Sequence, residues 1–102
     1  GQIDLTDVMF SLRAEIKGAM DMFNAQNVKG TKENLGSVKN LLNKVIAKAN
    51  EKNSVDFNEL LRPLKDAAAS WIDAVEKDNK QKVMESFGNF MNAFPKPYVA
   101  TL

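Results

Sequence analysis

The chain has 102 residues, the length of one domain, and a chain of this size buries about two thirds of its extended surface on folding. It contains no cysteine and no histidine, which excludes disulfides, thiolate metal sites, thiol nucleophiles and the most common general base. Its 14 Lys and Arg residues against 13 Asp and Glu give a net charge of +1, which provides no long-range attraction to nucleic acid or to an anionic membrane.

Four stretches carry apolar side chains at the 3.6-residue spacing that is typical of amphipathic helices. The first helix is predicted over residues 5–26, and Gly30 is the expected breaker after it. The second is predicted over residues 32–50, with Thr31 as its cap. Both stretches have a single apolar stripe, so each helix is expected to bury one face.

The third helix is predicted over residues 56–77 and has the strongest apolar stripe of the four. Asp56 followed three residues later by Glu59 indicates a capping box, and Ser54 is the alternative cap. The sequence therefore predicts a helix start close to residue 56.

The fourth helix is predicted over residues 79–94. Pro95 and Pro97 either end this helix or kink it into the apolar tail of residues 98–102, because proline removes a backbone donor and clashes with the preceding turn. We expect the tail to fold back over the open end of the molecule.

Together these elements predict an all-α fold, a single domain over residues 1–102. Short polar loops force consecutive helices to run antiparallel, so the expected architecture is an antiparallel up-down-up-down four-helix bundle. No apolar run approaches the ~18 residues that a membrane-spanning helix needs, and no stretch has the pattern of a signal peptide.

Catalytic and metal-binding patterns are missing from the sequence. A di-iron bundle site needs Glu-x-x-His pairs, and no nucleophile lies beside a base in any recognisable arrangement. We therefore expect a protein that is not an enzyme and holds no metal ion. Lys44, Lys48 and Lys52 share one side of the second helix, but no aromatic residues interleave them, which favours a solvated surface over a nucleic-acid site.

Methionine and phenylalanine provide the remaining candidates for a site. Met9, Met20, Met84 and Met91 lie on the apolar stripes, where a thioether either fills gaps in the core or binds copper(I) or haem iron. Phe10 projects away from its stripe, so we expect it to be exposed. It is then either an isolated surface residue or a contact with a partner or a second subunit.

Two short runs carry a family resemblance. Residues 4–12 (DLTDVMFSL) and residues 92–98 (NAFPKPY) resemble the two ends of the soluble periplasmic b-type cytochromes, which are four-helix bundles that bind haem. In that family a Met early in the first helix and a His near the end of the last helix bind the haem iron. The resemblance implies that Met9 is at the axial ligand position and that Pro95 replaces the His. It also implies electron transport and a periplasmic or secreted location.

Pro95 has no lone pair to offer iron, and the phenyl groups of Phe87, Phe90 and Phe94 are expected to fill the space that a porphyrin needs. The sequence therefore predicts a non-enzymatic, haem-free binding or structural module, a monomer or homodimer, whose partner is an unknown protein or a small apolar ligand. One alternative is an electron-transfer haem protein that uses Met9 with an unusual or exogenous second ligand. The other is a self-associating cytoplasmic or phage interaction module that uses Phe10 and the tail.

Overall fold

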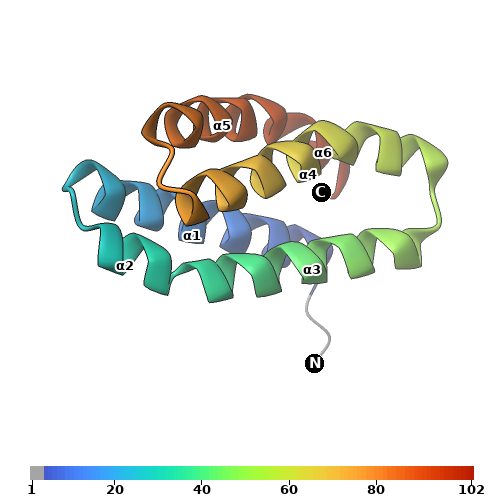
Figure 1. Ribbon diagram of the computed structural model, residues 1–102. Coiled ribbons are helices and arrows are strands. Elements are labelled where there is room, and N and C mark those ends of the chain that lie inside the picture. Colours follow the sequence, from blue (N-terminus) through green and yellow to red (C-terminus); the bar gives the residue numbers. More distant parts are fainter. Residues whose placement is uncertain (1–3) are drawn as a thin grey trace.

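The computed structural model describes residues 4–102, and this part of the chain contains six helices and no strand (Figure 1). The helices are α1 (Leu5–Asn24), α2 (Val28–Glu33), α3 (Leu35–Lys52), α4 (Val55–Glu76), α5 (Lys80–Ala93) and α6 (Pro95–Ala100). The long helices α1, α3, α4 and α5 alternate in direction along the molecule, with principal extents of 39 × 28 × 19 Å. The predicted antiparallel four-helix bundle is confirmed.

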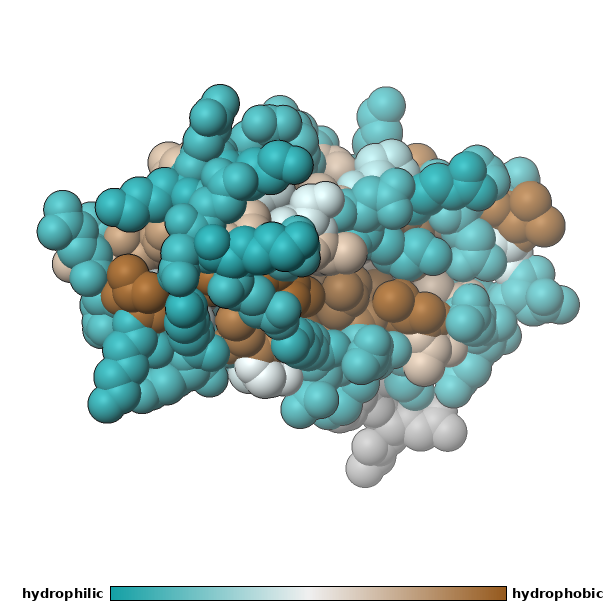
Figure 2. Space-filling model, in the orientation of Figure 1, coloured by the Kyte–Doolittle hydropathy of each residue, from teal (hydrophilic) through white to brown (hydrophobic). Residues whose placement is uncertain are grey.

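Each long helix packs against the next one in the chain, so that α1 contacts α3, α3 contacts α4 and α4 contacts α5. The short helix α6 touches α1, α4 and α5. On the face shown in Figure 2, hydrophilic side chains cover most of the surface, and most of the hydrophobic ones lie in a band along its length. None of the helices in the described part of the chain is long and apolar enough to cross a membrane.

The second predicted helix is the main error in the element boundaries. Residues 32–50 were expected to form one helix capped by Thr31, but the structure has two helices, α2 and α3, which meet at Asn34. Asn27 is the cap of α2, since its Oδ1 accepts a hydrogen bond from the Gly30 N–H at 2.9 Å. Thr31 is buried within α2, and its hydroxyl donates to the Asn27 carbonyl. A side-chain cap therefore starts a helix at Val28, four residues before the predicted start at residue 32.

Gly30 lies inside α2 and does not break a helix there. An added Cβ at this position would lie 2.6 Å from Asn27 Nδ2 and 2.7 Å from Met22 Sδ. The close approach of these two side chains explains why residue 30 is a glycine. The helix α1 ends earlier, at Asn24, and Gln26 in the connection after it has a left-handed φ of 61°.

The other boundaries differ from the predictions by one or two residues. Ser54 caps α4 by accepting from the Phe57 N–H at 3.1 Å, so the expected capping box at Asp56 is wrong and the alternative cap is right. Asn79 caps α5 in the same way, through the N–H of Lys82. In both cases the residue that precedes the first turn satisfies a backbone donor that has no partner within the helix.

The tail forms the last helix of the molecule. Pro95 is the first residue of α6, a position where proline loses no helical hydrogen bond, and Pro97 is buried. The Thr6 hydroxyl donates to Thr101, whose Oγ1 lies at 2.8 Å and whose carbonyl oxygen lies at 3.1 Å. The expectation that the tail folds back onto the bundle is therefore confirmed, and it docks at the start of α1.

Candidate functional site

Met9 lies on the buried face of α1 and has no exposed surface. It belongs to the hydrophobic core together with Val8 and Leu12, its neighbours on the same helix. A buried methionine among apolar side chains packs as a flexible hydrocarbon. The structure thus places the thioether in the core of the bundle.

Pro95, the second residue implied by the resemblance, lies at the junction of α5 and α6 beside a column of aromatic rings. Phe90 and Phe94 have ring centroids 6.0 Å apart, and Phe94 and Tyr98 stack at 5.0 Å. Both Phe90 and Phe94 are buried, whereas Phe87 is only partly buried against the core. Because the chain has no histidine, a Met–His pair for haem iron cannot form, and these residues do not fit the family's cofactor.

The structure does not bring the remaining candidates from the sequence together into a site. Within residues 4–102, no three side chains of the metal-binding types come together to form a cluster. On α3, Lys39 pairs with Glu76 and Lys48 with Glu51, so acidic side chains neutralise part of the lysine surface. Trp71 is fully buried and its Nε1–H donates to the sulfur of Met20 at 3.2 Å, which makes Met20 a core residue as well.

Phe10 is 55% exposed, as the sequence predicts, and it borders a groove that the sequence does not reveal. We call this the Phe10 groove; it has a volume of about 300 Å³ between α1, α5 and α6. Its lining residues are Phe10, Arg13, Met91, Phe94, Pro95, Tyr98 and Val99. Arg13 lies over the Phe94 ring with its Cζ 5.7 Å from the ring centroid. The structure therefore brings Phe10, Pro95 and the tail to one place, and Met9 is not among the residues that line it.

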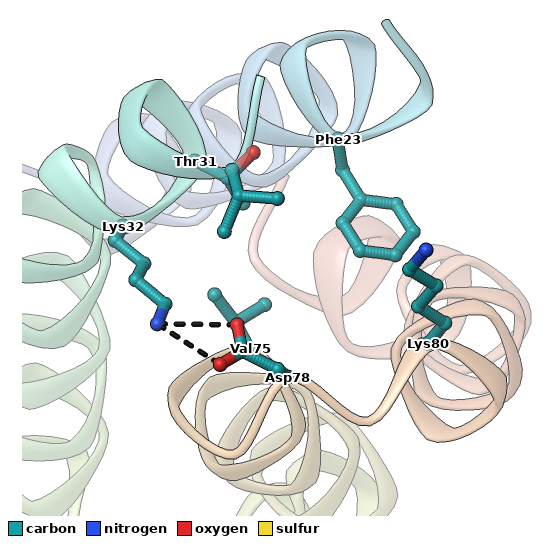
Figure 3. A pocket seen from close by; sticks show the side chains of 7 residues that line it. Phe23, Thr31, Lys32, Val75, Asp78 and Lys80 are labelled. Atoms are coloured by element: carbon teal, nitrogen blue, oxygen red, sulfur yellow. Dashed lines mark hydrogen bonds and ion pairs between the residues drawn. The ribbon is translucent and has the colours of Figure 1, made fainter. Parts of the chain in front are cut away.

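A second hollow lies where the α1–α2 and α4–α5 connections meet (Figure 3). We call it the end pocket; it also has a volume of about 300 Å³, close to the lower limit for small-molecule sites. Its lining residues are Phe23, Val28, Thr31, Lys32, Val75, Asp78 and Lys80. The walls are mostly apolar, with charged groups at the rim, which is the arrangement that ligand pockets usually have.

Sequence reasoning missed the end pocket because its walls come from two stretches, residues 23–32 and 75–80, that are far apart in the chain. An antiparallel bundle does place the first and third connections at the same end, and this was predictable. The pocket itself depends on α2, which positions Val28, Thr31 and Lys32, and the short Asn27-capped helix has no apolar periodicity to reveal it.

No family model, curated protein or solved structure matches this chain significantly. The resemblance to the b-type cytochromes therefore rests on the two short runs at the chain ends.

Proposed function

We propose that this chain is a haem-free, non-enzymatic binding module that acts in the periplasm or another secreted compartment and holds a small apolar ligand in the end pocket. The observation that carries the proposal is the pocket itself. Phe23, Val28 and Val75 form apolar walls contributed by three different helices, around a volume of about 300 Å³. The compartment follows only from the resemblance of residues 4–12 and 92–98 to an exported family.

The electron-transfer alternative has less support. It requires Met9 to reach iron, and this side chain lies in the core with no exposed surface. Binding in the end pocket needs no rearrangement of the core, because the pocket is already open between its walls.

The pocket can be tested with 1-octanol, an uncharged probe with an apolar chain. We expect 1-octanol to shift the ¹H–¹⁵N resonances of Phe23, Val28 and Val75, with a Kd of about 1 mM. Small ligands gain ~0.3 to 1.5 kcal/mol per non-hydrogen atom, and an open pocket gives values near the lower end. Val28→Asp should weaken binding about fivefold or more, since it places a charge on an apolar wall.

Val55→Asp provides the matched control for this experiment. Val55 is 77% exposed and begins α4, whereas Val75 lies near the other end of the same helix. Val55→Asp should leave the affinity for 1-octanol unchanged. Resonance shifts scattered over the surface, or equal effects of the two substitutions, would contradict the proposed function.

A second candidate function is self-association through the Phe10 groove, the role that would suit an interaction module of the cytoplasm or a phage. An exposed Phe beside an apolar groove on the same face is self-complementary, as a two-fold symmetric dimer requires. If α1 meets its copy antiparallel with Phe10 at the centre, residues at equal distances before and after Phe10 face each other. Asp7, exposed and three residues before Phe10, then lies opposite Arg13 of the second copy. The charges on this surface therefore favour a second copy of the chain as its partner.

Sedimentation velocity over a concentration series tests this dimer. We expect a weak dimer with a Kd of about 0.1 mM, because the contact is small. Phe10→Ser should raise the Kd about tenfold or more, as exposed aromatic anchors dominate small interfaces. Asp7→Arg should also weaken the dimer, since it brings like charges together. Adding Arg13→Asp to Asp7→Arg should restore the affinity to within about threefold.

Val55→Ser is the control for Phe10→Ser, since Val55 is also exposed and lies outside the groove. Far-UV circular dichroism checks that each variant folds. This check includes the double variant, in which Arg13→Asp removes the contact of Arg13 with the Phe94 ring. A strict monomer at about 1 mM protein, far above the expected Kd, would rule out this candidate function. A double variant as weak as Asp7→Arg alone would overturn the antiparallel arrangement.

A further inference from the structure

Three charged side chains determine the electrostatics of the end pocket. Lys32 Nζ lies 3.1 Å from Asp78 Oδ1 and 3.2 Å from Asp78 Oδ2, so these two groups neutralise each other. Lys80 also lines the pocket, but it forms no ion pair within residues 4–102. The lining therefore carries one uncompensated positive charge.

The position of that charge is visible in Figure 3. In this view the Lys80 side chain lies on the side of the pocket that Phe23 lines, across from the Lys32–Asp78 pair. The space between them is bordered by Val75 and by Thr31, whose hydroxyl is already used in its bond to the Asn27 carbonyl. An elongated ligand that enters the pocket would thus have an apolar body beside Phe23 and Val75, with a charged group within reach of Lys80.

We propose that the ligand of the end pocket is a small amphiphile with an unbranched or aromatic apolar body and a single anionic group, recognised by Lys80. This inference rests on the proposed function and specifies the chemical class of the ligand. At the ~30 Å³ that a water molecule takes up in the liquid, a volume of about 300 Å³ holds roughly ten groups of that size, which matches a medium-chain carboxylate such as octanoate.

The pairing of Lys32 with Asp78 explains why one negative charge suits the pocket. A monoanion neutralises the charge of Lys80 and leaves the existing ion pair intact. A cation would face Lys80, and the one carboxylate among the lining residues, that of Asp78, already pairs with Lys32. A second negative charge on the ligand would lie among apolar walls without a partner, which carries a desolvation cost.

The test compares three probes of the same chain length: octanoate, 1-octanol and octylammonium. Each is titrated into the full chain while the ¹H–¹⁵N resonances of the pocket residues are followed. We expect octanoate to bind about three- to tenfold more tightly than 1-octanol, and octylammonium to bind more weakly than 1-octanol. The advantage of octanoate should shrink in about 0.5 M salt, because a charge at the rim is screened.

Lys80→Gln should abolish the preference for octanoate while 1-octanol binds as before. Lys82→Gln is the matched control, because Lys82 lies on the same helix, is exposed and does not line the pocket. It should keep the preference.

The outcomes separate this inference from the function on which it rests. If 1-octanol binds in the pocket as tightly as octanoate, or if Lys80→Gln leaves the preference unchanged, the anionic class is overturned and the proposed function stands. If none of the three probes shifts the pocket resonances, the proposed function itself is overturned.

Discussion

Trp71→Ala is expected to lower the free energy of unfolding by about 3 to 5 kcal/mol. Trp71 is the largest fully buried side chain of the core, and alanine would leave a cavity that the surrounding helices fill only in part. The substitution also removes the N–H donor that reaches the sulfur of Met20. Urea denaturation followed by far-UV circular dichroism measures the change without depending on tryptophan fluorescence.

Two further variants separate the contributions to this effect. Trp71→Phe keeps most of the aromatic volume and removes the hydrogen bond, so we expect a smaller loss, about 1 to 2 kcal/mol. Val55→Ala should change stability by less than about 0.5 kcal/mol, because Val55 is largely exposed. A loss below about 1 kcal/mol for Trp71→Ala would contradict the central place of this side chain in the core.

The core around Trp71 also supports the end pocket. Val75 follows Trp71 by one helical turn, and Phe23 follows Met20 by three residues, so these two walls of the pocket lie directly beyond a core contact. Side chains held by a packed core keep a binding surface in place more firmly than loop residues do. Loss of Trp71 should therefore disturb the pocket resonances as well as stability.

The four long helices were predictable because their apolar stripes are long and regular. The stripe of the first predicted helix consists of residues that the structure buries, from Leu5 to Met20, and only Phe23 at its end is partly exposed. Phe10 was correctly placed outside it. Periodicity over about four or more turns depends on the average environment of a helix face, and small errors at single positions do not change it.

The short elements were not predictable for a physical reason. The helix α2 has six residues, fewer than two turns, and is capped by the side chain of Asn27; so short a helix has too few positions to show a stripe. The sequence did predict that the tail folds back onto the bundle, but the place where it docks depends on Thr6 and Thr101, which are 95 positions apart. Both features depend on contacts between particular residues, and α2 and α6 then provide walls of the end pocket and of the Phe10 groove, respectively.

Met9 distinguishes the two interpretations of the first helix, in which its side chain either fills the core or binds haem iron. If it fills the core, Met9→Leu should cost less than about 1.5 kcal/mol of unfolding free energy, since the two side chains have similar volumes. Met9→Ala should cost about 2 to 5 kcal/mol, because the residue has no exposed surface and alanine leaves a cavity. Urea denaturation of both variants provides the comparison, and equal, small losses would contradict a packing role.

Hemin titration of the same proteins tests the ligand role directly. We expect no sharp, stoichiometric low-spin Soret band in the natural chain or in Met9→Leu, since an iron ligand would have to leave a closed core and would lack a histidine opposite it. A band in the natural chain that Met9→Leu removes would instead restore the electron-transfer alternative. The stability of Met9→Leu is what makes this comparison decisive, because a variant that folds normally can lose such a band only by losing the thioether ligand.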